Sequence, residues 1–246
     1  GKTDGWHDAA FFNMCRPLEF VFSQGKDRGE QVGAVTMRVE DMTTFEEFYD
    51  AYKQQMEYCI SLLVNADNSI DTAHAIRCPL PFLSGLVDDC MKRGKTVQEG
   101  GAVYNFTGPQ GFGIANVADS LYAIKTLVFD EKKVTLAEYK RALALNFGKG
   151  FDAITIQEMT QDVLKELKKA GQTPSGAQIA GIVKGIAQTE LSGEDRELCD
   201  RLYAMIEEVP KFGNDIDEVD AFARDVAYTY TKPLQKYRNP RGGMFQ

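Results

Sequence analysis

The sequence predicts a helix-rich α/β fold, and two features of the chain lead to this prediction. Apolar residues recur at helical spacing over most of the 246 residues, and several of these runs begin at a capping box, a Ser or Thr followed three positions later by Glu. Residues 102–107 alternate weakly and contain Val, Tyr and Phe, so they are the best predicted strand. With 43% apolar residues, the chain can bury a sizeable core in one large domain or two small ones.

The first third of the chain carries the clearest helix signals. A capping box at Thr44 opens a long helix to about residue 65, and a second apolar run over residues 69–77 can extend it. A shorter apolar pattern covers residues 8–23, where Pro17 should kink or restart the helix because proline lacks a backbone N–H.

Proline and glycine divide the rest of the chain into shorter segments. Pro79 and Pro81 break the backbone, after which Ser84 can cap a short helix that Gly94 closes. Further helices are predicted over residues 114–128, from Thr135 to about 146, from Thr155 to 170, from Thr173, from Gly193, and over 215–237, where Pro233 kinks or ends the last one.

The glycine-rich stretch GPQGFG, residues 108–113, is predicted to be a bend and not a phosphate loop. A phosphate loop needs GxxxxGK followed by Ser or Thr, and Ile114 stands where the lysine belongs. The spacing also differs from the GxGxxG of dinucleotide-binding folds. We therefore expect these glycines to let the backbone pass close to another strand or to a ligand.

Charge and cysteine content narrow the class of function. A net charge of -8 without a basic cluster argues against nucleic-acid binding and favours a small-molecule enzyme or a soluble partner protein. The chain has no apolar run of the ~20 residues that span a bilayer and no signal peptide. Its five cysteines form no CxxC pair and its two histidines are not spaced with them as zinc ligands, so we expect no metal site and a reducing, cytoplasmic compartment.

Five stretches, taken together and in this order, carry a family resemblance: GKTDGWHDAAFFNM, RCPLPFLSGLVDDCMKRGK, QEGGAVYNFTGPQGFGIANVADSLYAIK, PKFGNDIDEVD and NPRGGMFQ. They resemble glycyl radical enzymes of the pyruvate formate-lyase-like superfamily, in the branch of glycerol and diol dehydratases. The resemblance covers about residues 1–147 and 207–246. It implies that residues 1–246 are part of a ten-stranded α/β barrel of that type, helix-rich in this part.

The resemblance also implies which parts of the chemistry lie elsewhere. The catalytic Cys of the family stands in a GCVEP-like motif before the segment similar to residues 1–8, and the radical-bearing Gly in an RVAGY-like motif after the segment similar to residues 239–246. Neither motif occurs in this sequence, so we expect an interior piece with no catalytic residue of its own. The whole protein would be a homodimer whose glycyl radical is installed by a separate S-adenosylmethionine-dependent activating enzyme, and the piece alone would be inactive.

One pair of residues is a candidate for substrate binding. In the dehydratases that the chain resembles, the Asp of GWHD hydrogen-bonds a substrate hydroxyl, which here implies Asp8 with His7 beside it. Asp8 could equally cap a helix, and His7 could be a hydrogen-bonded structural ring. Asn105, Gln110 and Asn116 are predicted to line the barrel or to brace it, and Arg238, Asn239 and Arg241 to brace the fold or to lie in solvent.

Compared with a compact dehydratase of the family that the chain resembles, the chain is longer between residues 135 and 210, which implies a helical insertion over residues 148–195. The function implied for the whole protein is elimination of water or another leaving group from a small hydroxylated substrate by radical chemistry. Three alternatives stay open: an isethionate-type C–S lyase, an arylacetate decarboxylase of the same superfamily, or a non-catalytic helical binding module.

Overall fold

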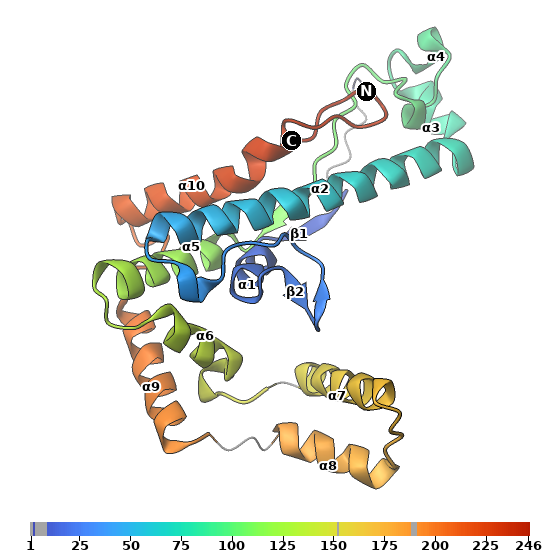
Figure 1. The fold of residues 1–246 in the computed structure, drawn as a ribbon. Helices are drawn as coiled ribbons and strands as arrows, with labels where there is room; N and C mark the ends of the chain where they lie inside the picture. Colours follow the sequence, from blue (N-terminus) through green and yellow to red (C-terminus); the bar gives the residue numbers. More distant parts are fainter. Residues whose placement is uncertain (1, 3–8, 152, 188–190) are drawn as a thin grey trace. The chain divides into compact units, whose positions relative to one another are not determined.

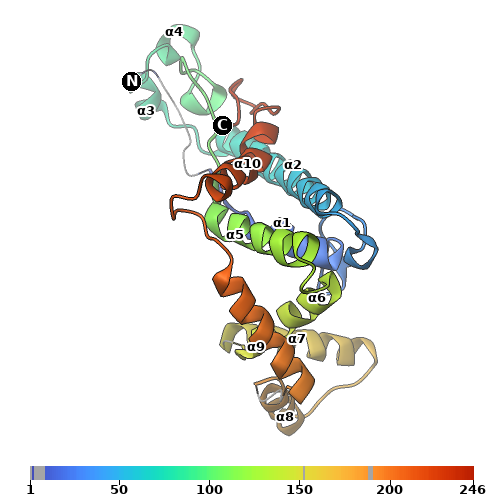
Figure 2. The ribbon, with the colours of Figure 1, turned by 90° about the vertical axis from the view of Figure 1, so that its left-hand side faces the viewer.

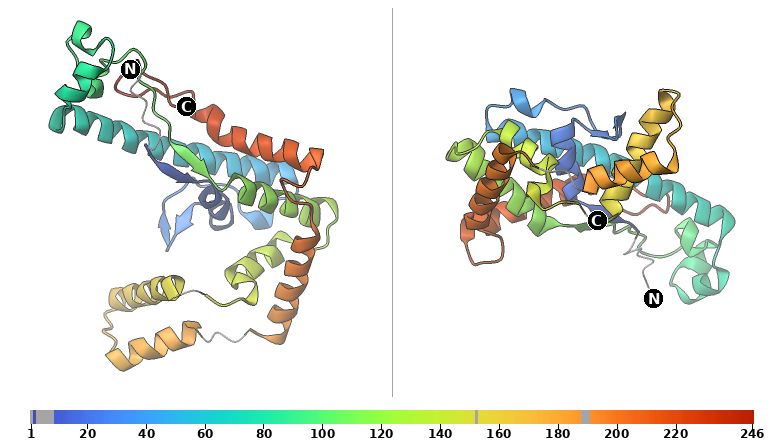
Figure 3. Two further views of the ribbon diagram at one scale, coloured as in Figure 1. Left: turned by 180° about the vertical axis from the view of Figure 1, so that it is seen from behind. Right: turned by 90° about the horizontal axis from the view of Figure 1, so that it is seen from below.

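A computed structural model describes residues 2, 9–151, 153–187 and 191–246. They form two compact units, one of residues 1–122 with 210–246 and the other of residues 123–209. Figure 1 gives the labels of the elements, and Figures 2 and 3 show the same ribbon from other sides. Within the described residues, no helix is both long and apolar enough to cross a membrane.

Helix α2 (Phe45–Arg77) is the main element of the first unit. It lies beside α10 (Asp217–Leu234) and packs against α1 (Cys15–Ser23) (Figure 1). Every fourth residue of α2 is buried along one face, and these residues are Phe48, Tyr52, Met56, Ile60 and Val64. This spacing makes one apolar stripe on a helix, so α2 supplies much of the core of the unit.

The capping box at Thr44 is confirmed. Thr44 Oγ1 accepts from Glu47 N at 3.3 Å, and Glu47 Oε2 accepts from Thr44 N at 3.1 Å. The helix continues to Arg77 without a break, so the second apolar run does extend it. Shorter helical elements of this unit are η1 (Val39–Asp41), α3 (Pro81–Leu86), α4 (Cys90–Arg93), η2 (Val97–Glu99) and α5 (Ile114–Ile124), whose last residues cross into the second unit.

The strands of the unit are short. β1 (Phe11–Asn13) pairs in parallel with β4 (Gln110–Phe112), with Phe12 opposite Gly111. A parallel bridge joins Thr107 to Phe245, and β2 (Lys26–Asp27) forms an antiparallel pair with β3 (Glu30–Gln31). The parallel pairs therefore bring together three segments that are far apart in the sequence.

The strand predicted over residues 102–107 is wrong in position, because β4 lies in the predicted glycine bend. The expectation that a glycine allows a close approach there is confirmed at Gly111. A Cβ at this position would lie 2.9 Å from the ring of Tyr230 and 3.2 Å from the sulfur of Met14. Tertiary contact has overridden local strand propensity.

Two predicted helix boundaries also differ from the structure. The pattern over residues 8–23 is not one helix, because residues 11–13 form β1 and the helix begins at Cys15. Pro17 then falls in the first turn, where its missing N–H costs no hydrogen bond, so it neither kinks nor restarts the helix. Ser84 lies inside α3, where its hydroxyl donates to Leu80 O at 2.7 Å and accepts from Val97 N at 3.0 Å.

The second unit is helical. It contains the π-helix η3 (Lys125–Asp130), α6 (Leu136–Ala144), η4 (Asn146–Gly148), α7 (Ala153–Lys169), α8 (Gly176–Ala187) and α9 (Gly193–Glu208). A capping box at Thr135 opens α6, and Ser192 caps α9. The predicted insertion over residues 148–195 includes α7 and α8, which pack against each other. That this segment is an insertion stays a prediction.

Gly111→Ala should destabilise the chain by about 1–3 kcal/mol, because the new methyl group would overlap the Tyr230 ring. Chemical denaturation of the 246-residue chain would measure the loss. Gly85→Ala is the matched control, since a Cβ there would meet nothing within 4 Å. Equal stability of the two variants would contradict the close approach.

Candidate functional site

A buried polar junction joins three segments of the first unit. Asp71 on α2, Thr107 before β4, and Asn239 and Arg241 after α10 are each at most 5% exposed. Arg241 Nε donates to Asp71 Oδ2 at 3.0 Å, and Arg241 Nη2 donates to Thr107 Oγ1 at 3.0 Å. Asn239 Nδ2 donates to the same hydroxyl oxygen at 2.8 Å. Each of these side chains therefore has partners from another segment, as buried polar groups require.

The sequence RNPRGG makes the tight turn that places two of these side chains. Gly242 N donates to Asn239 O at 3.1 Å, and Gly243 N donates to Asn239 Oδ1 at 2.8 Å. Gly242 has a φ of 84°, a left-handed value that favours glycine. At Gly243 a Cβ would lie 1.7 Å from Asn105 O, so only glycine permits this approach.

A hollow of about 430 Å³ lies next to the junction. Its walls are residues 103–106, residues 242–244, Gln246 and Arg238. Tyr104 is 61% exposed and Met244 is 39% exposed. The Asn105 side chain is held in place, because its Nδ2 donates to Ala102 O at 2.9 Å.

The predicted substrate-binding residues His7 and Asp8 lie outside the described residues. The described residues before and after them contact the segment 104–110, of which residues 104–106 line the hollow. Lys2 O accepts from Tyr104 N at 3.1 Å, and Ala10 O accepts from Gln110 N at 2.8 Å. We therefore take this hollow, together with the segment 104–110, as the candidate functional site.

A second buried carboxyl group, that of Asp67, lies on α2 next to the junction residue Asp71. Asp67 lies one helical turn before Asp71 and is 8% exposed, and its Oδ2 has no hydrogen-bond partner among the described residues. Burial, and then the charge of Asp71, raise the pKa of Asp67 to about 6. A carboxyl group buried without a cation is costly when ionised, so Asp67 holds its proton to higher pH than a surface aspartate.

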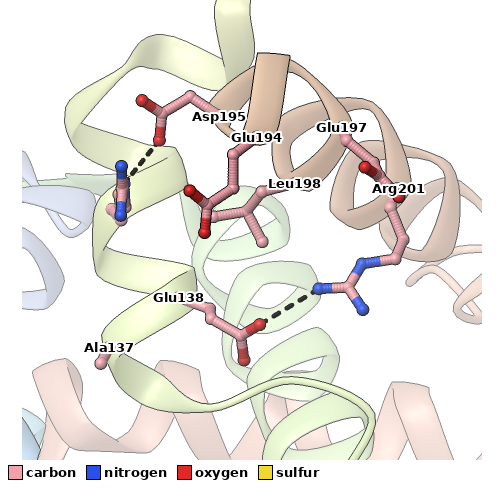
Figure 4. Close-up of a pocket in the computed structure, with 8 residues that line it drawn as sticks. Ala137, Glu138, Glu194, Asp195, Glu197, Leu198 and Arg201 are labelled. Atoms are coloured by element: carbon pink, nitrogen blue, oxygen red, sulfur yellow. Dashed lines mark hydrogen bonds and ion pairs between the residues drawn. The ribbon is translucent and has the colours of Figure 1, made fainter. Parts of the chain in front are cut away.

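A second hollow, of about 360 Å³, lies in the second unit between α6 and α9 (Figure 4). Two ion pairs cross it, Arg141 Nε to Asp195 Oδ1 at 2.5 Å and Arg201 Nη2 to Glu138 Oε1 at 3.1 Å (Figure 4). The bond to Arg141 lowers the pKa of Asp195, so this carboxylate is ionised at neutral pH. The hollow is best explained as a solvent-exposed ion-pair network that holds α6 against α9.

Three of the cysteines have thiols that burial keeps protonated. Cys90 and Cys199 are buried, Cys15 and Cys59 are half-buried, and Cys78 is exposed. Burial raises the pKa of the Cys15 and Cys199 thiols, and that of Cys59 to about 11, so these side chains are thiols at neutral pH. Within the described part of the chain, no group of three or more His, Cys, Asp or Glu residues could hold a metal ion.

Comparison with known proteins gives the family. The family model described as pyruvate formate lyase-like matches residues 1–246. The chain belongs to this family. A solved structure from work on 1,2-propanediol dehydration in Roseburia inulinivorans is 59% identical to this chain, with a TM-score of 0.92. The match covers 100% of this chain and 29% of the Roseburia chain. The B12-independent glycerol dehydratase from Clostridium butyricum is 42% identical, with a TM-score of 0.77 over 100% of this chain and 25% of that one.

A curated relative gives a similar result over part of the chain. The (2S)-3-sulfopropanediol dehydratase of Klebsiella oxytoca is 42% identical over 149 residues, which are 60% of this chain and 18% of that protein. The chain thus spans less than a third of the length of each of these relatives. The resemblance to glycyl radical dehydratases is confirmed, as is the prediction that this helix-rich chain is part of an α/β barrel of that type.

Asp67→Asn should stabilise the chain at pH 7 more than at pH 4.5. The folded pKa of Asp67 lies above its unfolded value, so stability from this group is complete below about pH 4 and falls as the pH rises through about 6. The neutral amide removes this loss, which is on the order of 1–2 kcal/mol after solvent screening. Urea unfolding at both pH values would measure it, with the exposed Asp88→Asn as control. An increase in the free energy of unfolding from Asp67→Asn that is the same at both pH values would contradict the raised pKa of Asp67.

Proposed function

We propose that this chain is part of a glycyl radical dehydratase that removes water from a small vicinal diol. The observation that carries the proposal is the 59% identity over the entire chain to a protein studied for 1,2-propanediol dehydration. Identity of 42% to a glycerol dehydratase over the entire chain supports the same substrate class. Propane-1,2-diol is therefore the first substrate to test, with glycerol as the second.

Asp8 and His7 are the proposed substrate-binding residues of this chain. The Asp8 carboxylate would accept a hydrogen bond from a substrate hydroxyl, and this bond would strengthen as the hydroxyl becomes more acidic during loss of the neighbouring group. His7 would lie beside the carboxylate as a second hydrogen-bonding group. The contacts of Lys2 with Tyr104 and of Ala10 with Gln110 support a site next to the hollow.

The radical chemistry belongs to residues outside this chain. A glycyl radical installed by an S-adenosylmethionine-dependent activating enzyme would supply hydrogen-atom abstraction in the whole protein. The sequence has neither the GCVEP-like nor the RVAGY-like context of the two radical-bearing residues, so no step of the reaction is assigned to a Cys or Gly here. We propose that the whole protein is a cytoplasmic homodimer with the activating enzyme as its partner.

Other leaving groups are less well supported. An isethionate sulfite-lyase of Oleidesulfovibrio alaskensis is 32% identical over 65% of this chain. A 4-hydroxyphenylacetate decarboxylase glycyl radical subunit of Clostridioides difficile is 29% identical over 53% of it. Both identities are lower than the 59% and 42% of the propanediol and glycerol relatives, which match the entire chain, so dehydration is preferred.

In the whole protein, activated without oxygen, Asp8→Asn should lower kcat for propane-1,2-diol by about 10²–10⁴-fold, because the amide cannot act as a charged acceptor. Aldehyde formation would be measured with Asp88→Asn as the control at an exposed position. Two results would contradict the proposal: no turnover of either propane-1,2-diol or glycerol by the unaltered protein, or full activity of Asp8→Asn.

The 246-residue chain alone should show no turnover when incubated without oxygen with the activating enzyme and S-adenosylmethionine. The physical reason is that neither proposed radical-bearing residue is part of it. Electron paramagnetic resonance and aldehyde formation would be measured in parallel with the whole protein as positive control. A glycyl signal or product from the chain alone would refute this division of roles.

A further inference from the structure

The guanidinium of Arg241 bonds both α2 and the segment before β4. Its Nε donates to Asp71 Oδ2 on α2, and its Nη2 donates both to Phe106 O at 3.1 Å and to Thr107 Oγ1 at 3.0 Å. The side chain is 0% exposed, and that of Asp71 is 4% exposed. Only the planar fork of arginine can reach these acceptors in fixed directions, since lysine offers a single ammonium.

Stability alone is a weak reason for such a pair. Removing two charges from water costs several kcal/mol per ion, and apolar residues of similar volume often stabilise a fold at least as well. A buried ion pair instead fixes the relative position of the segments that carry it, because its hydrogen bonds form in only one arrangement of those segments. The segments that the Arg241–Asp71 pair joins are therefore the ones whose relative position it fixes.

The pair fixes a register that the backbone alone holds weakly. Thr107 N donates to Met244 O at 2.9 Å, and Gln246 N donates to Thr107 O at 3.0 Å. These bonds form a single parallel bridge and not a longer ladder. Residues 103–106, just before Thr107, and Met244 and Gln246 are walls of the 430 Å³ hollow, so a slip between the two segments would change its shape.

We propose that Arg241 is a positioning residue: it sets the register of residues 104–107 against residues 244–246 and so keeps the hollow in the shape that binds substrate. The substrate part of this inference rests on the proposed function. Asn239 supports the same register, because its Nδ2 donates to Asn105 O at 2.6 Å. Arg241 acts through these walls and does not itself touch the reacting atoms.

The double variant Asp71→Leu/Arg241→Met separates positioning from stability. It removes both charges together, so neither partner of the ion pair is left buried without the other, and it should keep the thermal midpoint of the protein. A purely structural pair would then leave activity intact. Positioning predicts that kcat/KM for propane-1,2-diol in the activated whole protein falls at least tenfold although the fold is retained.

Amide hydrogen exchange gives a second readout that does not depend on activity. The amides of Thr107 and Gln246 should exchange at least tenfold faster in the double variant, whereas those of Met14 and Gln110, which bond across β1 and β4, should not change. The matched control is Arg38→Met/Asp41→Leu, the same pair of substitutions at an exposed ion pair of 2.8 Å, and it should alter neither readout.

Unchanged exchange at Thr107 and Gln246, or full kcat/KM in a folded double variant, would overturn the proposal. If the double variant does not fold, Arg241→Lys keeps the charge without the planar guanidinium. It should show the same fall in kcat/KM and the same faster amide exchange. Failure of the unaltered protein to convert propane-1,2-diol would count against the proposed function, while the exchange measurement would still decide the role of Arg241.

Discussion

The hydrogen bonds of Arg241 to Asp71, to Phe106 O and to Thr107 are the constraint on which the first unit depends. They tie the longest helix to the approach to β4 and to the turn after α10. The Asn239 bonds to Thr107 and Asn105, one parallel bridge and a close glycine contact hold the same segments together. The charged junction thus defines the geometry of a site whose walls are otherwise short and irregular.

Local signals in the sequence were enough to predict most helices. Capping boxes at Thr44 and Thr135 mark helix starts correctly because they are satisfied by residues three positions apart. The strand was misplaced for the opposite reason. Gly111 has poor strand propensity, and β4 forms there by pairing with β1, about a hundred residues earlier, while the Tyr230 ring leaves room only for the hydrogen of glycine.

The site was predictable only in part. Asn239 and Arg241 were expected to brace the fold or lie in solvent, and the structure shows that they brace it. Asp71 was missed, although a signal exists: Asp67 and Asp71 continue the buried face of α2, where an acidic residue needs a partner. That partner comes from the other end of the chain, which no local pattern reveals. Asp8 and His7 came only from the family resemblance.

The most direct test of this account is a crystal structure of the whole protein with propane-1,2-diol bound, determined without oxygen. We expect a diol hydroxyl within hydrogen-bond distance of the Asp8 carboxylate, in a cavity whose walls include residues 104–106, Met244 and Gln246. We also expect an intact bond between Arg241 and Asp71 in that complex. Diol bound away from Asp8, or a cavity that excludes these walls, would contradict the account.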